Sequence, residues 1–242
     1  MIQVIAQRGL AVRCPENTLL AFERAFALGV DGVSLDLRRS ADGALVVFRD
    51  ESLRRVTGVD LPVGELTVRE LKTLDASLHF HNQCPVQRIP LFEEYCALVR
   101  KKSVLTLIEL QTLEDEMPGI ERAMVELIDA FRLNDRVIVC SRNHDSLTRV
   151  AALAPDLPRG ALYTCRLSEP QEYAKARGMQ YLLPNHRFLA DADYQKYEAA
   201  GVKTIPWGAE NDKDLGALMD KRNVTAVLTA NPAVAMALQN RK

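Results

Sequence analysis

Short apolar runs alternate with segments of helical periodicity from one end of the chain to the other. The runs are rich in Val, Ile and Leu, and their apolar and polar positions do not alternate strictly. Such runs are typical of strands that are buried on both faces of a parallel sheet. They predict nine strands, at residues 3–6, 32–37, 44–48, 104–109, 136–140, 160–163, 180–183, 203–206 and 225–228.

The helical segments between the runs carry capping signals. We expect Asn17 to be the N-cap of a helix that Gly29 ends. Thr67 followed by Glu70 fits a capping box. Ser168 followed by Gln171 fits a second one. The signals therefore predict a repeated strand-helix order.

About eight strand-helix units in 242 residues predict a single α/β domain, residues 1–242, folded as a TIM-type (β/α)8 barrel. An open doubly wound sheet is the alternative for the same order of elements. Residues 38–43 are too few for a helical crossover, so we expect a tight turn between the second and third strands. Residues 51–88, after the third strand, are long and mostly without strand signals. We expect them to form a small insertion at the barrel mouth.

The charges on the chain are almost balanced, with 31 Lys and Arg against 32 Asp and Glu and a formal net charge of −1. Nucleic acids and anionic membrane surfaces are bound by an excess of Lys and Arg on one face, so we expect neither as a partner. No apolar run approaches the roughly 20 residues of a membrane-spanning helix, and the N-terminus lacks the pattern of a signal peptide. We therefore expect a cytoplasmic protein with a small-molecule partner. The five cysteines are scattered and form no CxxC pair, which argues against a disulfide framework or a zinc site.

Polar and charged residues follow the first four apolar runs where barrel strands would end. The ends of parallel barrel strands meet at one mouth. Charged groups at apolar strand ends are costly unless they face a cleft or pair with one another. The pattern therefore predicts a polar site at the mouth, although a single pair such as Arg8 and Glu16 is equally well explained as an ordinary salt bridge. The residues concerned are Gln7, Arg8, Glu16, Ser34, Asp36, Arg49 and Glu109.

Several of these residues belong to five short sequence runs, which follow one another along the chain at residues 5–9, 15–18, 29–36, 45–50 and 108–109. With these runs the chain resembles the glycerophosphodiester phosphodiesterase family. The resemblance implies a TIM-type barrel and a reaction of lipid metabolism, the metal-assisted hydrolysis of a glycerophosphodiester to sn-glycerol 3-phosphate and an alcohol. It also implies two acid/base histidines, and a divalent cation, Mg²⁺ or Ca²⁺, held by a Glu-x-Asp pair and a further glutamate.

The chain departs from the family at these catalytic positions. Gln7 and Arg49 stand where the two histidines belong, and neither an amide nor a guanidinium group transfers protons near pH 7. Ser34 replaces the first metal-ligating glutamate, which leaves Asp36 and Glu109 as an incomplete metal site. We expect the Arg49 guanidinium to pair with Asp36 or Glu109 and to occupy the space of the cation.

The leading interpretation is a catalytically impaired or inactive family member, a pseudoenzyme that still binds a small phosphorylated ligand. The resemblance implies Arg8, Glu16 and Trp207 as the substrate-binding residues, although Trp207 is equally well explained as a packing residue of the core or rim. The alternative is an active metal-dependent phosphoric diester hydrolase that releases sn-glycerol 3-phosphate, with Glu16 or a loop histidine, His79 or His81, as the base. A third interpretation is a barrel that only binds a protein partner.

Overall fold

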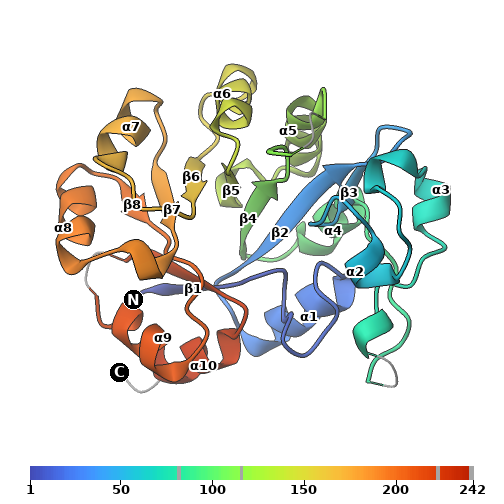
Figure 1. The fold of residues 1–242 in the computed structure, drawn as a ribbon, viewed down its shortest axis with the longest axis horizontal. Coiled ribbons are helices and arrows are strands. Elements are labelled where there is room, and N and C mark those ends of the chain that lie inside the picture. The colour runs from blue at the N-terminus through green and yellow to red at the C-terminus, as the bar shows by residue number, and fades with distance from the viewer. Residues whose placement is uncertain (81–82, 115–116, 222–223, 240–242) are drawn as a thin grey trace.

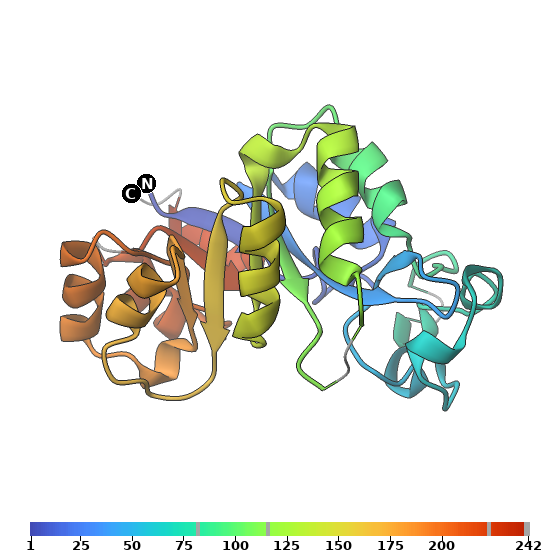
Figure 2. The same ribbon diagram turned by 90° about the horizontal axis from the view of Figure 1, so that it is seen from above.

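The computed structural model describes residues 1–80, 83–114, 117–221 and 224–239. Within these residues, eight parallel strands form a barrel in the order β8-β7-β6-β5-β4-β2-β1-β9, surrounded by helices (Figures 1 and 2). Backbone hydrogen bonds from Thr225 to Thr204 and from Leu228 to Pro206, both 3.0 Å, join the last two strands and close the barrel. The strands are β1 (Gln3–Ala6), β2 (Gly32–Arg39), β4 (Leu105–Leu110), β5 (Val137–Ser141), β6 (Arg159–Tyr163), β7 (Tyr181–Pro184), β8 (Lys203–Thr204) and β9 (Ala226–Thr229).

A helix follows each barrel strand and packs on the outside of the barrel (Figure 1). These helices are α1 (Leu19–Leu28), α4 (Phe92–Val99), α5 (Ile120–Phe131), α6 (His144–Leu153), α7 (Pro170–Ala176), α8 (Asp191–Ala199), α9 (Asp212–Met219) and α10 (Pro232–Gln239). Short 3-10 turns, η3 (Asn134–Arg136) and η4 (His186–Phe188), complete two of the connections. The TIM-type barrel predicted from the sequence is confirmed, and all nine predicted strands are present. Among the described residues, no helix is long and apolar enough to cross a membrane.

The barrel strands are buried on both faces, which explains their unbroken apolar sequences. Alternate residues of each strand fill either the barrel interior or the layer between the strands and the helices. Ile5 and Leu107 belong to the interior cluster, whereas their neighbours Val4 and Ile108 pack toward the helices. Neither face of such a strand meets solvent, so most of its residues are apolar.

The connection between β2 and β4 contains the elements that depart from the regular repeat. β3 (Leu45–Val47) pairs antiparallel with β2 after a tight turn in which the Ser40 N–H donates to the Ala44 carbonyl at 2.9 Å. This turn confirms the one predicted at residues 38–43. α2 (Arg54–Thr57), η1 (Val63–Glu65), α3 (Val68–Leu71) and η2 (Leu78–Phe80) follow, around a small apolar cluster of their own. They form a lobe at one side of the barrel (Figure 2).

The helix caps agree with the sequence in part. The Thr67–Glu70 capping box is present at the start of α3, and Gly29 ends α1 in the left-handed conformation. The N-cap of α1 is Thr18, one residue after the predicted Asn17. The predicted box of Ser168 and Gln171 is wrong, because Glu169 is the residue that precedes α7 and the Gln171 amide donates to its carboxylate.

Replacement of the capping residue in Thr67→Ala should lower the free energy of unfolding by about 1 kcal/mol. The Thr67 hydroxyl accepts from the Glu70 N–H and donates to the Glu70 carboxylate, so the variant loses both of these hydrogen bonds. The hydrogen bond from the Thr67 backbone N–H to the Glu70 carboxylate does not depend on the replaced side chain. Urea unfolding followed by circular dichroism measures the change. Thr148→Ala, in the exposed middle of α6, is the matched control and should change stability by no more than about 0.5 kcal/mol. Equal midpoints for Thr67→Ala and wild type would contradict the prediction.

Candidate ligand site at the barrel mouth

The two predicted carboxylates are brought together by the register of β2 and β4. These strands are parallel neighbours, with Asp36 opposite Glu109 and Ser34 opposite Leu107. Leu107 belongs to the barrel interior, and residues two apart on a strand face the same side. Asp36 and Glu109 therefore face the inside of the barrel at the carboxyl ends of their strands, where a (β/α)8 barrel has its mouth.

A tight turn after β1 brings Arg8 to the same place. Arg8 and Gly9 have positive φ angles of 55° and 77°. A Cβ at Gly9 would lie 2.6 Å from the backbone of Ala21, so this position requires glycine. In the turn, the Arg8 N–H donates to the Ser34 hydroxyl at 3.2 Å, and Arg8 Nε lies 3.0 Å from Asp36 Oδ2.

Asp36 is buried, and both of its carboxylate oxygens have partners. Asn17 Nδ2 donates to Oδ2 at 2.8 Å, in addition to the Arg8 contact. Gln111 Nε2 donates to Oδ1 at 2.6 Å. Burial alone would lower the pKa of Arg8, but the charges of Asp36, Glu16 and Glu109 raise it above its ordinary value. Arg8 is therefore a permanent cation of this site.

Glu109 pairs with a residue from the next strand, Arg142. Arg142 follows β5 directly, and its Nη2 lies 3.4 Å from Glu109 Oε1. The same nitrogen donates to Gln111 Oε1 at 3.2 Å. Burial, and then the neighbouring charge of Asp36, raise the pKa of Glu109 to about 7. Gln111 thus connects the ion pair at Glu109 with the ion pair at Asp36.

Glu16 links the barrel to the segment that follows β3. Arg55, from α2, donates to Glu16 through two nitrogens, at 2.6 Å and 3.0 Å, and its Nε pairs with Asp50. Arg8 Nη1 approaches Glu16 Oε1 at 3.4 Å. These contacts raise the pKa of Arg55 above its ordinary value, with the hydrogen bonds to Glu16 as the largest cause. A continuous chain of ion pairs and hydrogen bonds therefore runs across the mouth from Arg142 to Asp50.

The structure places Arg49 at the Asp50 end of this chain, and not beside Asp36 or Glu109. Its side chain is 38% exposed, and Nη1 pairs with Asp50 at 3.6 Å. The Arg49 carbonyl accepts from Arg38 Nε at 2.7 Å, which fixes the backbone of this turn. The interpretation that Arg49 pairs with Asp36 or Glu109 is therefore wrong, because Arg8 and Arg142 already occupy those carboxylates.

The remaining predicted positions lie near the same mouth or outside the described residues. Gln7 is half-buried, and its backbone N–H donates to the Thr229 carbonyl at 2.8 Å. Trp207 follows β8, and its indole N–H donates to the Leu183 carbonyl at 3.1 Å beside the interior cluster. His79 contacts the Arg55 carbonyl through Nε2, and His81 lies outside the described residues.

Two arginines of the mouth, Arg142 and Arg55, were not predicted from the sequence. Arg142 stands directly after a barrel strand, and a search of the strand ends beyond the fourth run would have found it. Arg55 lies on a short helix in a segment without strand signals, and no pattern in the sequence connects it with Glu16. Asn17 was assigned to a helix cap, but its φ of 57° and its hydrogen bond to Asp36 make it a residue of the site.

The residues present do not fit a divalent cation. Mg²⁺ and Ca²⁺ require several oxygen ligands with lone pairs directed at the ion. The oxygens of Asp36 accept hydrogen bonds and an ion pair from Gln111, Asn17 and Arg8 instead. Within the described ranges, no three His, Cys, Asp or Glu side chains are clustered as a metal site needs.

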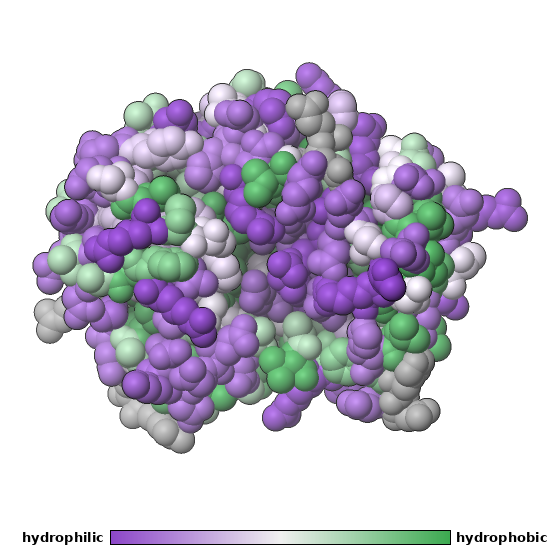
Figure 3. Space-filling model, viewed as in Figure 1, coloured by the Kyte–Doolittle hydropathy of each residue, from purple (hydrophilic) through white to green (hydrophobic). Residues whose placement is uncertain are grey.

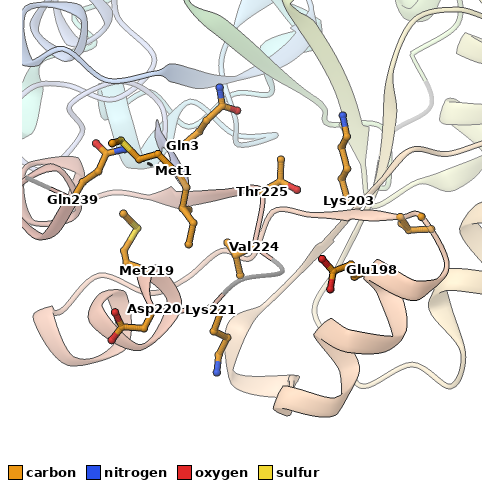
Figure 4. Close-up of a pocket in the computed structure, with 13 residues that line it drawn as sticks. Met1, Gln3, Glu198, Lys203, Met219, Asp220, Lys221, Val224, Thr225 and Gln239 are labelled. Atoms are coloured by element: carbon orange, nitrogen blue, oxygen red, sulfur yellow. Dashed lines mark hydrogen bonds between the residues drawn. The ribbon is translucent and has the colours of Figure 1, made fainter. Parts of the chain in front are cut away.

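Figure 3 shows the molecule in the view of Figure 1, from the side on which the barrel strands end. Hydrophilic side chains surround a central hollow on this face and are densest toward β2 and α2. A separate cavity of about 1000 Å³ opens at the other end of the barrel, where β1, β8 and β9 begin (Figure 4). None of the predicted site residues lines that cavity. Its lining includes Met1, Gln3, Glu198, Lys203, Met219, Lys221, Thr225 and Gln239.

The model of the glycerophosphoryl diester phosphodiesterase family matches residues 8–234. The chain belongs to this family. A glycerophosphodiester phosphodiesterase from Caldanaerobacter subterraneus subsp. tengcongensis is 36% identical over 229 residues, which cover 95% of this chain and 94% of the relative. The recognition of the family from the sequence is thereby confirmed.

Solved structures of family members share the fold. The structure of an Oleispira antarctica phosphodiesterase in complex with the product sn-glycerol-3-phosphate is 26% identical, with a TM-score of 0.88 over 98% of this chain and 96% of that one. A glycerophosphodiester phosphodiesterase from Agrobacterium tumefaciens has a TM-score of 0.84 at 22% identity and covers 98% of this chain and 100% of its own. The chain therefore spans nearly the full length of these relatives.

Proposed function

We propose that this family member binds a small phosphorylated ligand, a glycerol phosphate or a glycerophosphodiester, at the barrel mouth and hydrolyses phosphodiesters poorly or not at all. One observation carries the proposal. The Asp36 carboxylate, at a position that the family resemblance assigns to a metal ligand, is buried and held by Arg8, Asn17 and Gln111. Three of the about four lone-pair positions of this carboxylate are thus engaged, and the positive charge of Arg8 beside it opposes the binding of a cation.

The positions of the two family histidines support the same conclusion. Hydrolysis of a phosphodiester requires a proton donor for the leaving alkoxide and a base for the attacking water. Gln7 has no titrating group, and the guanidinium of Arg49 stays protonated. Neither position can supply the proton transfer that the family resemblance assigns to it.

Ligand binding is supported by the cations at the mouth. Guanidinium groups are well suited to phosphoryl oxygens because they present several N–H donors in one plane. Arg8 and Arg49 retain N–H groups beyond those used by Glu16, Asp36 and Asp50. The Oleispira antarctica relative was solved with sn-glycerol-3-phosphate, which suggests the class of ligand.

We also propose a cytoplasmic location, and residues 51–88 as an insertion that contributes Arg55 to the mouth.

Glycerol 3-phosphate should raise the melting temperature of the wild type by about 3–6 °C when its concentration is about ten times the Kd. The increase should disappear in Arg8→Ala, because this variant loses the buried guanidinium of the site. Differential scanning fluorimetry, with sodium sulfate as a control for ionic strength, measures the shift. Arg24→Ala, which removes an exposed arginine of α1, should keep the full increase.

An unchanged melting temperature of the wild type at millimolar glycerol 3-phosphate would contradict the binding proposal. The alternative of an active hydrolase predicts something different, namely metal-dependent turnover by the wild type that is lost in Glu109→Ala. The two measurements are independent, so each part of the proposal is tested separately.

A further inference from the structure

We propose that Arg142 supplies from within the chain the positive charge that a bound cation would otherwise bring to the phosphoryl group, so that ligand binding at this mouth is independent of metal. The inference rests on the proposed ligand binding and assigns the residue that makes this binding independent of metal. Arg142 is the cation paired with Glu109, at the second position that the family resemblance assigns to metal ligation.

The position of Arg142 follows from the barrel register. Glu109 lies opposite Asp36 on β2 and opposite Cys140 on β5. Arg142, two residues beyond Cys140, is at the carboxyl end of β5 and therefore at the mouth. Its guanidinium approaches Glu109 at 3.4 Å and donates to Gln111 at 3.2 Å. These two contacts of Nη2 thus hold the positive charge of Arg142 beside Glu109.

The same contacts leave other donors of Arg142 available. Both use Nη2, and among the described residues Nε and Nη1 have no hydrogen-bond or ion-pair partner. The side chain is 28% exposed, so these two N–H groups are not sealed in the core. Nε and Nη1 of a guanidinium group do not share an edge, but each can donate to an oxygen of a phosphoryl group.

The other arginines of the mouth are less suited to this role. Arg55 is committed to Glu16 by two hydrogen bonds and to Asp50 by a further pair. Arg49 lies on the exposed turn beside Asp50. Arg142 and Arg8 follow β5 and β1, the strands that flank β4 and β2, and they contact Glu109 and Asp36 respectively. Their charges lower the otherwise raised pKa of Glu109. Arg142 therefore stands on one side of the paired carboxylates and Arg8 on the other.

The experiment measures the affinity for glycerol 3-phosphate by titration calorimetry in EDTA and again in MgCl₂. Wild-type affinity should be the same in both buffers. Arg142→Gln should weaken binding by about tenfold or more, because a charge-assisted contact to the phosphoryl group is lost. Arg142→Lys keeps the charge and should bind more tightly than Arg142→Gln. Arg166→Gln, an exposed arginine on the loop after β6, is the matched control and should bind as the wild type does.

Loss of wild-type binding in EDTA, or wild-type affinity in a folded Arg142→Gln variant, would overturn the inference. Circular dichroism spectra and melting temperatures establish that the variants are folded. A second readout works even where glycerol 3-phosphate does not bind and the proposed function fails. Electron paramagnetic resonance of Mn²⁺ should show about tenfold tighter binding to Arg142→Gln than to the wild type, because Glu109 loses its paired cation. Equal Mn²⁺ affinities would also overturn the inference.

Discussion

Wild-type protein is expected to hydrolyse glycerophosphocholine at about one hundredth or less of the rate of a variant that combines Gln7→His, Ser34→Glu and Arg49→His, whichever of Mg²⁺, Ca²⁺ or Mn²⁺ is added. General acid and base catalysis alone contributes about 10²–10⁴ to a rate, and both groups are missing from the wild type. The Ser34→Glu substitution restores a carboxylate at the position of the missing metal ligand. An assay that couples the release of glycerol 3-phosphate to its oxidation by an added NAD-dependent dehydrogenase measures both rates.

The ion pairs at the mouth limit how much faster than the wild type the triple variant can hydrolyse the substrate. In the triple variant Glu109 still faces Arg142, which competes with a cation for the carboxylate. A quadruple variant with Arg142→Ser added should therefore exceed the triple variant in metal-dependent rate. Replacement of Asp60, an exposed carboxylate paired with Arg54, is the control for a nonspecific effect of charge and should leave every rate unchanged.

Metal-dependent turnover by the wild type that disappears in Glu109→Ala would show that the chain is an active hydrolase. This outcome is the alternative that the family membership keeps open, because the 36% identical relative is named as a glycerophosphodiester phosphodiesterase. The assay separates the two functions without reference to ligand affinity. A protein can bind glycerol 3-phosphate in either case, so binding alone does not decide between them.

The barrel was predictable because its signal is local and repeated. Each strand, such as β1 or β5, is a short apolar run bounded by polar residues, and each can be recognised without knowledge of its neighbours. The tight turn before β3 was predictable from its length alone. Residues that follow a strand could also be assigned to the mouth, since all parallel barrel strands end there. Arg8, Asp36 and Glu109 were found in this way.

The pairing of charges at the mouth was not predictable in the same manner. The partner of a carboxylate depends on the register between strands and on the path of the loops, which no single segment encodes. Arg49 is close in sequence to the expected site, yet the tight turn leaves it beside Asp50. Arg55 reaches Glu16 across 39 positions of sequence, from a helix outside the barrel repeat. The prediction that a guanidinium pairs with Asp36 or Glu109 therefore named the wrong arginine, because Arg8 and Arg142 are their partners.

Replacement of the central carboxylate in Asp36→Ala should lower the free energy of unfolding by about 3–5 kcal/mol. The side chain of Asp36 is 3% exposed, and that of Arg8 is 17% exposed. Removal of the carboxylate leaves the guanidinium without its nearest counter-charge and leaves the amides of Asn17 and Gln111 without their acceptor. Buried donors and charges without partners are among the most costly defects in a folded protein.

Urea unfolding followed by circular dichroism and by the fluorescence of Trp207 measures this loss, and coincidence of the two transitions shows whether a single free energy applies. Asp60→Ala is the matched control. The side chains of Asp60 and of its partner Arg54 are 70% and 74% exposed, so the change should be less than about 1 kcal/mol.

The sign of the change in unfolding free energy in Asp36→Ala also distinguishes a working metal site from a site whose carboxylates are neutralised by arginines. In a working metal site the carboxylates repel one another without the cation, and removal of one stabilises the protein without its metal, at the expense of activity. In the arrangement described for this chain, Asp36 is neutralised by Arg8 and hydrogen-bonded on both oxygens. Its removal should therefore destabilise the protein equally in EDTA and in Mg²⁺. A variant that is more stable than the wild type in EDTA would show that the carboxylates of this mouth are still arranged for a metal ion.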